Sequence, residues 1–229
     1  MAERPFALLA DDMGLGKTAQ AILAADMVNA QRILIICPAV ARLNWKREFH
    51  EFSIFDRDFV VCLRTMDRPG QSSVVSYDYA VANHSWLISM QWDLVIVDES
   101  HFLKEPTSKR TRVIYGIDGI IRKTKRLWCL SGTPAPNHAG ELWPMLFTFG
   151  ATRLSYEQWV KKFCNHRTVW YGNKPQLKIY GTQDGNAPLL KHILKNYTEG
   201  TRQNASVTSG KGWPAMAQAM TGGTEMGIS

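Results

Sequence analysis

The sequence lacks any run of apolar residues long enough to cross a membrane, since a spanning helix needs about 20 predominantly apolar residues. Its first apolar stretch runs directly into a glycine-containing segment at 13–16, and a secretory signal peptide does not have that form. We therefore expect no membrane partner and no secretion. The hydrophobic fraction of 45% and the charged fraction of 21% are those of an ordinary globular protein.

Cysteine is scarce, and its spacing offers no metal site. The four residues Cys37, Cys62, Cys129 and Cys164 form no C-x-x-C pair, so the sequence argues against a zinc site. Three of them fall in predicted strands, and buried free thiols in a reducing compartment are the simplest interpretation. We expect a cytoplasmic protein, associated with the nucleoid, or a nuclear one if the source is eukaryotic.

Acidic residues are in deficit. The chain has 20 Asp and Glu against 27 Lys and Arg, which gives a formal net charge of +7. Basic residues gather at 104–112 and at 122–126, so a polyanionic partner is one interpretation and a solvated helix or loop face is the other. No base-reading motif is visible, and contacts with DNA, expected to be duplex, should be mainly to phosphates.

A short glycine-containing loop is the most informative segment of the chain. It follows a strand-like apolar run at 6–10 and precedes a helix-like pattern at 17–29, the context that a phosphate-binding Gly-Lys-Thr motif requires. Backbone N–H groups and the Lys17 charge would hold the phosphates of ATP, and the Thr18 hydroxyl would bind Mg²⁺. The residues predicted to bind ATP are Met13, Gly14, Leu15, Gly16, Lys17, Thr18 and Ala19.

One position departs from the general phosphate-loop pattern. The first glycine of G-x-x-x-x-G-K-[ST] would fall at position 11, which is Asp11. Taken alone, the motif therefore leaves open a simple glycine turn before an ordinary helix.

An acidic pair follows a second strand-like run. Residues 92–97 are nearly continuous apolar sequence, typical of a strand buried on both faces of a parallel sheet. Asp98 and Glu99 come where that strand ends, and ligands of open α/β sheets bind outside the carboxyl ends of the strands. Asp98 is the candidate Mg²⁺ ligand and Glu99 the candidate base for a water molecule; an acidic pair capping the next helix is the alternative. With Lys17, these two complete the predicted catalytic set.

The order of these motifs resembles that of the Swi/Snf-type DNA translocases of helicase superfamily two, in a phage or bacterial branch. Residues 9–18 resemble motif I, where that family usually has an acidic residue at the position of Asp11. The other matching segments, which extend the resemblance over residues 6–165, are 33–38 with Asn44-Trp45 and Glu48-Phe49, Ser76-Tyr77, Asp98–His101 with Leu103-Lys104, and Ser131–Pro134 with Asn137 and Glu141–Trp143.

The resemblance implies further roles. His101 and the Ser131-Gly132-Thr133 turn would couple the state of ATP to DNA. A plain exit from a strand into a turn is the alternative for that segment, and a core aromatic on an amphipathic helix is the alternative for Trp45. The residues implied to lie near DNA are Pro38, Asn44, Trp45, Ser76 and Asn137.

Alternation of strand-like and helix-like segments predicts an α/β fold, a three-layer parallel sheet with helices on both faces. The resemblance specifies this as a RecA-like P-loop NTPase lobe over residues 1–153. We expect a small helical appendage over 154–196 and a disordered tail over 197–229, which is rich in Gly, Thr, Ser and Met. The predicted strands are 6–10, 32–37, 59–63, 73–77, 94–97 and 126–131, and the predicted helices are 17–29, 40–52, 109–121, 140–149, 156–163 and 187–194.

The family works with two RecA-like lobes, and the second supplies arginine fingers. A chain of 229 residues has no room for another lobe of that size, so we expect a truncated or frame-shifted product that needs a missing second lobe. The leading prediction is the ATP-binding motor lobe of a DNA translocase. A catalytically silent nucleotide- or DNA-binding fragment and a strand-separating DNA or RNA helicase are the alternatives; a small-molecule kinase fits poorly.

Overall fold

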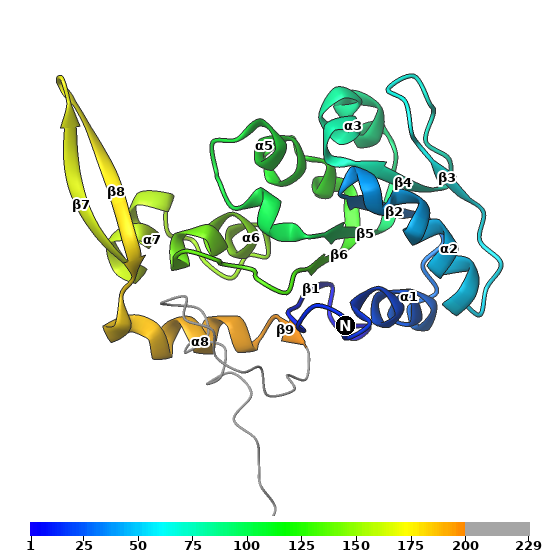
Figure 1. Ribbon diagram of the computed structural model, residues 1–229, viewed down its shortest axis with the longest axis horizontal. Helices are drawn as coiled ribbons and strands as arrows, with labels where there is room; N and C mark the ends of the chain where they lie inside the picture. The colour runs from blue at the N-terminus through cyan, green and yellow to red at the C-terminus, as the bar shows by residue number, and fades with distance from the viewer. Residues whose placement is uncertain (200–229) are drawn as a thin grey trace, which may run out of the picture.

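The computed structural model describes residues 1–199, and its main body is one parallel β-sheet (Figure 1). Every neighbouring pair in this seven-stranded sheet is parallel, and the spatial order is β3-β4-β2-β5-β6-β1-β9. The strands are β1 (Phe6–Leu9), β2 (Ile33–Cys37), β3 (Phe59–Val61), β4 (Ser72–Ser76), β5 (Trp92–Asp98), β6 (Thr124–Leu130) and β9 (Thr198–Glu199).

Helices cover both faces of the sheet, which confirms the predicted three-layer α/β fold. Within residues 1–199, α1 and α2 pack on one face and the remaining helices on the other or beside it. The helices are α1 (Lys17–Met27), α2 (Arg42–Phe52), α3 (Tyr77–Ala82), α4 (His84–Ser89), α5 (Lys109–Tyr115), α6 (Trp143–Thr148), α7 (Tyr156–Phe163) and α8 (Ala187–Lys195). The short 3₁₀ helices are η1 (Ala39–Ala41), η2 (Ser100–Leu103), η3 (Ile120–Lys123), η4 (Ala139–Leu142) and η5 (Asp184–Asn186).

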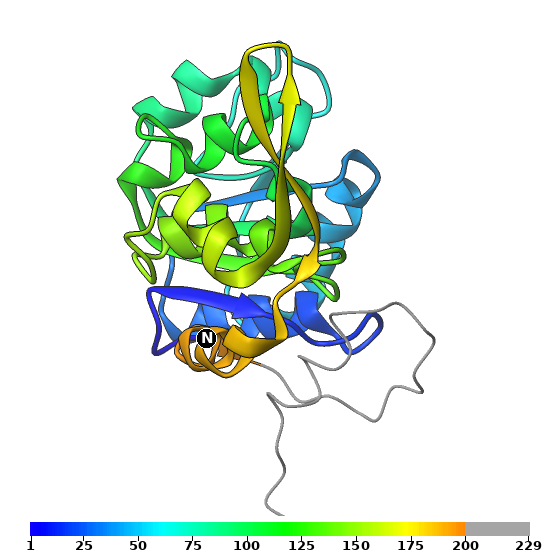
Figure 2. The same ribbon diagram turned by 90° about the vertical axis from the view of Figure 1, so that its left-hand side faces the viewer.

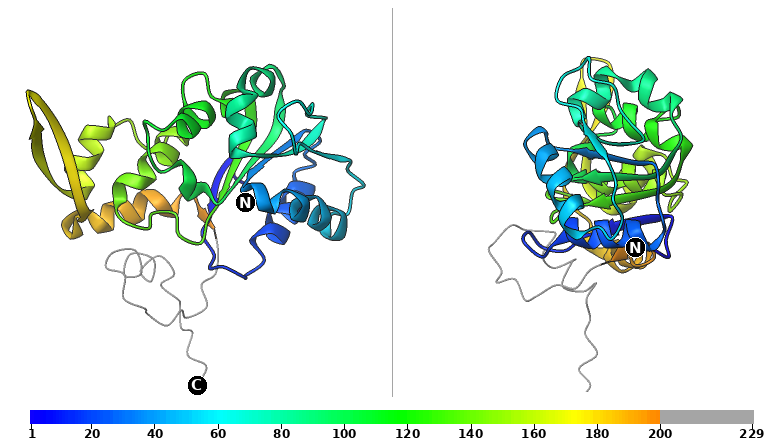
Figure 3. Two further views of the ribbon diagram at one scale, coloured as in Figure 1. Left: turned by 45° about the horizontal axis from the view of Figure 1, so that its top comes forward. Right: turned by 90° about the vertical axis from the view of Figure 1, so that its right-hand side faces the viewer.

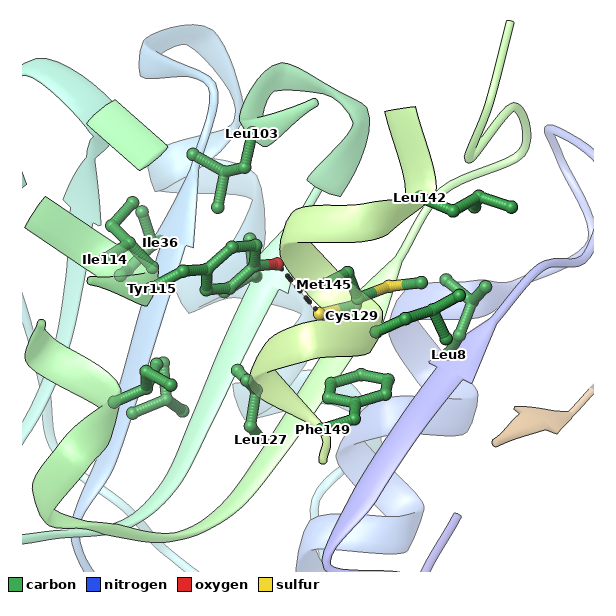
Figure 4. Packing of buried hydrophobic residues seen from close by; sticks show 14 of the residues in the cluster. Leu8, Ile36, Leu103, Ile114, Tyr115, Leu127, Cys129, Leu142, Met145 and Phe149 are labelled. Carbon is green, nitrogen blue, oxygen red and sulfur yellow. Dashed lines mark hydrogen bonds between the residues drawn. The ribbon is translucent and has the colours of Figure 1, made fainter. Parts of the chain in front are cut away.

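Side chains of each central strand alternate between two hydrophobic clusters. Along β6, Leu127 and Cys129 face the cluster under α5 and α6, whereas Trp128 and Leu130 face the cluster under α1 and α2. Figure 4 shows the first cluster, where the Tyr115 hydroxyl lies 3.2 Å from the Cys129 sulfur. Because each strand is buried on both faces, its sequence is continuously apolar rather than alternating.

One predicted helix is much shorter in the structure than in the sequence pattern. The helix expected over 109–121 ends at Tyr115, and the chain resumes as η3 only at Ile120. Gly116 has an extended backbone at the C-cap, and the intervening residues form a turn. The sequence pattern also missed α3 and α4, which are only six residues each and too short for helical periodicity to stand out.

The helical appendage expected over 154–196 also contains a β-hairpin that the sequence pattern did not predict. Helices α7 and α8 form as expected, but an antiparallel hairpin of β7 (Cys164–Tyr171) and β8 (Lys174–Thr182) separates them. The hairpin projects from the body beyond α7, at the opposite end of the long axis from β3 (Figures 1 and 3). Its polar and aromatic residues do not show the clean alternation by which strands are found in a sequence.

The predicted disordered tail is wrong at its first residues. Thr198 and Glu199 form β9, which pairs with β1, and the Leu8 N–H donates to the Tyr197 carbonyl at 2.7 Å. The Tyr197 ring lies 5.4 Å from that of Phe149. Pairing satisfies the free edge of β1, a gain that the local sequence does not reveal. The rest of the predicted tail, residues 200–229, lies outside the described residues.

The four cysteines are free and buried. Burial raises the pKa of the Cys129 thiol to about 12, so this thiol stays protonated near neutral pH. Over residues 1–199 no helix has the length and apolarity that crossing a membrane requires.

Candidate functional site

Three loops meet at the carboxyl edge of the sheet, after β1, β5 and β6. Leu130 of β6 pairs with Leu9 of β1 on one side and with Asp98 of β5 on the other. The ends of the three strands are therefore level, and the Ser131 N–H donates to the Leu9 carbonyl at 3.1 Å. Strand order brings together segments that lie about 30 to 120 positions apart in the chain.

The phosphate-loop candidate has the backbone that its sequence predicts. Gly14 and Gly16 have φ of 84° and 68°, and Gly16 is the N-cap of α1. A Cβ at either position would meet no atom within 4 Å, so the left-handed backbone itself requires glycine here. The half-buried Thr18 and Ala19 lie in the first turn of α1, and Met13 is exposed at the tip of the loop.

The Lys17 ammonium is held by its own loop. Its Nζ donates to the carbonyl oxygens of Asp11 and Asp12, each at 3.0 Å. Gln20 adds a second tie, because its Nε2 donates to Asp11 Oδ2 at 2.9 Å and to the Leu15 carbonyl at 3.0 Å. Gln20 was not among the residues predicted to bind ATP. Its position two residues after Thr18, in the first turn of α1, could have indicated that it lies near the phosphate loop.

Asp11 itself is buried, with 2% of its surface exposed. Its Oδ1 has no hydrogen-bond partner among the described residues. A Cβ on Gly132 would lie 3.5 Å from the Asp11 carbonyl and 3.4 Å from Met13, so the turn after β6 packs closely against the phosphate loop. This contact links two of the predicted motifs.

Asp98 is anchored from both sides of its carboxylate. Trp45 Nε1 donates to Oδ2 and the Glu99 N–H donates to Oδ1, both at 2.9 Å. Burial raises the pKa of Asp98, and the Glu99 charge adds to this, while the Trp45 hydrogen bond and the Lys17 charge act in the opposite direction. The register of β1, β6 and β5 places the phosphate loop and the acidic strand end at the same edge of the sheet.

Tyr77 contacts the backbone of both acidic residues, Asp98 and Glu99. Its hydroxyl donates to the Asp98 carbonyl at 2.6 Å and lies 3.3 Å from the Glu99 carbonyl. Burial raises the pKa of Tyr77 well above its ordinary value, so it remains a hydrogen-bond donor. Glu99 has φ of 51°, a left-handed backbone that non-glycine residues adopt at a cost of about 1–3 kcal/mol. Sequence reasoning gave Tyr77 only a place in a small motif.

A polar chain runs from Glu99 to the turn after β6. His101 Nδ1 lies 3.2 Å from Glu99 Oε2 and 3.0 Å from Ser131 Oγ. The Thr133 N–H in turn donates to Ser131 Oγ at 3.2 Å. The structure thus brings together the residues predicted to couple ATP to DNA, although their role stays a prediction.

Two of the residues implied to lie near DNA do not present their side chains to a partner. Trp45 is 1% exposed and Ser76 is 7% exposed. Trp45 packs in the core while its indole binds Asp98, and Ser76 accepts from the Tyr79 N–H as the N-cap of α3. Both side chains therefore support the fold in this structure, as the core-aromatic alternative expects for Trp45. That these two segments lie near DNA stays a prediction.

The other three implied DNA residues lie at the surface. Asn44 donates from Nδ2 to Glu48 Oε1 at 2.5 Å, and Asn137 donates from its N–H and from Nδ2 to the Glu141 carboxylate. Pro38 is half-buried before η1. Their contact with DNA stays a prediction.

The residues at this edge fit ATP and Mg²⁺. The loop offers glycine-permitted backbone and one ammonium, and Thr18 and Asp98 offer hard oxygen atoms. Residues 1–199 contain no group of three or more His, Cys, Asp or Glu side chains that could hold a metal. Mg²⁺ at phosphate sites uses one or two protein ligands plus phosphates and water, so this small donor set suits it.

Comparisons with known proteins agree with the geometry. A model of the SNF2-related domain matches residues 4–198. A SWI/SNF-related matrix-associated actin-dependent regulator of chromatin subfamily A-like protein 1 homolog from Caenorhabditis elegans is 34% identical over 146 residues, which are 61% of this chain and 21% of that protein. The human DNA annealing helicase and endonuclease ZRANB3 is 28% identical over 201 residues, which are 82% of this chain and 18% of that protein.

A solved structure confirms the predicted fold. The Sulfolobus solfataricus SWI2/SNF2 ATPase core in complex with dsDNA matches with a TM-score of 0.67 and 23% sequence identity, over 90% of this chain and 42% of that one. The chain thus spans about a fifth of the length of the two curated relatives and less than half of this ATPase core. The assignment to a phage or bacterial branch stays a prediction. Because the family match covers nearly all of the described residues, the chain belongs to the SNF2-related domain family, as the first RecA-like lobe of a Snf2-type member of helicase superfamily two.

Proposed function

We propose that this chain is the ATP-binding motor lobe of a DNA translocase, and that it hydrolyses ATP with Mg²⁺ when a second RecA-like lobe completes the site. One observation carries the proposal. The loop that bears Lys17 and the strand end that bears Asp98 and Glu99 lie at the same level of the sheet edge, close enough for Lys17 to act on Asp98.

The loop would bind the phosphates of ATP. Backbone N–H groups at the N-terminus of α1 suit an anion, and the Lys17 ammonium suits the β and γ phosphates. In this structure Lys17 Nζ donates to the carbonyl oxygens of Asp11 and Asp12 at 3.0 Å. Phosphate oxygens of ATP would replace these two uncharged acceptors. Such an exchange keeps the ammonium hydrogen-bonded throughout, which makes the loop ready for the nucleotide.

The acidic strand end would perform the chemistry. Thr18 and Asp98 would hold Mg²⁺, which neutralises charge on the phosphates. Glu99 would orient a water molecule and accept its proton. The two ties on Asp98 from Trp45 and the Glu99 N–H fix its carboxylate, and the Tyr77 hydroxyl fixes the backbone between the two acids.

The chain of contacts from Glu99 through His101 to Ser131 would couple hydrolysis to DNA. A change of charge or hydrogen bonding at Glu99 reaches the turn after β6 through a single imidazole nitrogen. The same turn packs against the phosphate loop at Gly132. The turn therefore contacts both sides of the nucleotide site, and this position suits a coupling element.

The relatives support duplex DNA as the partner. The matched Sulfolobus ATPase core was solved in complex with dsDNA, and the human relative is named a DNA annealing helicase. Translocation along duplex DNA is the proposed activity; strand separation is the near alternative, which an unwinding assay on the two-lobe protein would decide.

ATP binding and hydrolysis by the purified chain, with and without duplex DNA, test the proposal. We expect weak binding and slow turnover by the isolated lobe, because arginine fingers come from the second lobe. Lys17→Ala should weaken ATP binding about 10- to 100-fold, since a hydrogen bond to a charged group contributes about 1.5–3 kcal/mol. Lys195→Ala, which removes an exposed lysine of α8, is the matched control.

The outcomes separate three readings. ATP binding that does not depend on Lys17 would contradict the site assignment. Strong DNA-stimulated turnover by the purified monomer would contradict the need for a second lobe. Lys17-dependent binding without turnover supports half of a motor, and restored turnover after adding a second lobe would exclude a silent fragment.

A further inference from the structure

The hairpin of β7 and β8 is a projecting arm with a fixed base. At the base the Ala139 N–H donates to Thr182 Oγ1 at 2.9 Å, and the Gln183 N–H donates to the Phe163 carbonyl at 2.8 Å. Leu177 and Ile179 pack against the main hydrophobic cluster. Beyond these contacts the two strands extend away from the body (Figure 1). Figure 2 views the molecule from the side of the arm, with the hairpin in front of the body.

Cross-strand register assigns the arm's side chains to two faces, because residues directly opposite each other in an antiparallel pair share a face. One face has the pairs His166–Ile179, Thr168–Leu177 and Trp170–Pro175, and it includes the two residues that pack on the body. The other face has the pairs Arg167–Lys178, Val169–Gln176 and Tyr171–Lys174. The Arg167 guanidinium also lies 4.9 Å from the centre of the Tyr180 ring, so Tyr180 joins this second face.

The second face concentrates unpaired positive charge. Arg167, Lys174 and Lys178 are exposed, and the sequence from Cys164 to Thr182 contains no Asp or Glu. Within residues 1–199, no carboxylate lies at ion-pair distance from any of the three. Arg167 stands directly opposite Lys178, and like charges in that position destabilise a hairpin. An anion bound at this face would relieve the repulsion between the two cations.

Aromatic rings lie exposed beside these charges. Trp170 is 65% exposed, Tyr171 62% and Tyr180 53%. Tyr171 and Lys174 flank the tip, where Gly172 has φ of 61° and permits a tight turn. Tyr171 and Tyr180 lie on the face that carries the cations, and Trp170 lies on the opposite face. Exposed rings next to cations are the arrangement on which unpaired bases stack while their phosphates meet the charges; bases inside a duplex offer no free ring face.

We propose that the β7–β8 arm binds single-stranded DNA, with bases stacking on Tyr171 and Tyr180 and phosphates contacting Arg167, Lys174 and Lys178. The nine residues of β8 extend about 30 Å at about 3.3 Å per residue, enough for several nucleotides. The inference rests on the proposed function in one respect, that the protein works on DNA. It adds a site for unpaired bases remote from the nucleotide loop.

The test is binding of the full 229-residue chain to fluorescent dT20 and to a 20-base-pair blunt duplex, without nucleotide. We expect Tyr171→Ala to weaken dT20 binding about 5- to 100-fold, the effect of losing one stacked base, and to change duplex binding less than about twofold. Tyr171→Phe keeps the ring and should bind dT20 like the wild type. Lys174→Gln/Lys178→Gln should lower the slope of log affinity against log salt by about 1.4, since each phosphate contact on a single strand contributes about 0.7.

Substitutions outside the arm serve as controls for the loss of positive charge. Arg64→Gln/Lys195→Gln removes two exposed cations outside the arm and should leave dT20 binding near that of wild type. Three results would each overturn the proposal. They are no dT20 binding by the wild type, dT20 binding that Tyr171→Ala does not weaken, and an equal loss of affinity for dT20 and for the duplex in Tyr171→Ala. Lys17→Ala should bind dT20 normally, so failure of the nucleotide site and failure of the arm give different results.

Discussion

The sheet body and the β7–β8 arm differ in how far their side chains are buried. In the body, β2 is buried along its whole length and the interior consists almost entirely of apolar side chains. In the arm, most side chains are exposed and the cations lack ion-pair partners within the described residues. The body obtains its stability from burial, whereas the arm depends on its base contacts for position. Substitutions should therefore affect folding in one region and binding in the other.

Polar groups show the same contrast. In the body, Asp98, Tyr77 and Glu141 all have hydrogen-bond partners from other elements or loops, because an unsatisfied buried polar group costs free energy. In the arm, Arg167 and Lys178 oppose each other without a counter-charge. In the proposed complex, the phosphates of single-stranded DNA would supply the counter-charge.

The loss of stability should be greatest for a substitution in the core of the body, and the matching substitution in the arm should cost almost none. Trp128→Ala in β6 removes a fully buried indole whose Nε1 donates to the Arg4 carbonyl, and should lower the free energy of unfolding by about 3–5 kcal/mol. Trp170→Ala in the arm removes an exposed ring and should change it by less than about 0.5 kcal/mol. Urea denaturation followed by circular dichroism measures both. Equal losses would mean that the arm is part of the cooperative core.

An intermediate effect is expected at η4, the joint between the two regions. The Glu141 carboxylate accepts from the Asn137 N–H and Nδ2 and pairs with Lys104 at 3.0 Å. Glu141→Gln keeps the shape but loses one acceptor and the charge, and should cost about 1–3 kcal/mol of unfolding free energy. Urea denaturation at pH 7 measures it, and an unchanged stability would contradict the assigned network.

The pH dependence at this joint has a defined sign. Burial opposes ionisation of Glu141, but the Asn137 hydrogen bonds and Lys104 outweigh it and lower the pKa below its ordinary value of 4.5. The ionised carboxylate therefore stabilises the fold fully above that value, and the contribution is lost as pH falls through the folded-state pKa. The difference between wild type and Glu141→Gln should shrink in acid; a difference that grows in acid would contradict this account.

A modest change in stability is expected at the left-handed backbone of Glu99 in the candidate site. Glu99 has a left-handed backbone, so Glu99→Gly should relieve strain and raise the free energy of unfolding by up to about 1 kcal/mol, offset in part by glycine entropy. The same change removes the proposed base. Asn29→Gly, at the other left-handed non-glycine residue within 1–199, should gain less, because Asn tolerates this backbone. Thermal unfolding compares them; a loss of stability in Glu99→Gly would mean that the His101 contact outweighs the strain.

Much of the fold was predictable because its signals are local. The apolar runs at β2 and β5 and the Gly-Lys-Thr loop before α1 depend on near neighbours in the chain, and the structure has them at the expected positions. The β7–β8 hairpin and β9 were missed. Their stability comes from contacts with η4 and with the edge of β1, which no local pattern contains.

Within the candidate site, residue identity was predictable but some roles were not. The resemblance placed Trp45 and Ser76 near DNA, but it did not reveal that the first binds Asp98 and the second caps α3. Gln20 and Tyr77 are recognised as parts of the candidate site only from hydrogen bonds, which Gln20 donates to Asp11 and Tyr77 donates to the Asp98 carbonyl. Such contacts join distant segments, and sequence spacing does not encode them.

The sequence alone identified the functional groups of the candidate site, which follow apolar strands. They are the ammonium of Lys17, the hydroxyl of Thr18 and the carboxylates of Asp98 and Glu99. Motif order was enough to indicate the family because each motif is short and local. Only the tertiary structure decided that these groups share one edge, that His101 bridges Glu99 and Ser131, and that the arm presents its cations on one face. The physical reason is that strand order and register set those distances, and both follow from the packing of the whole sheet.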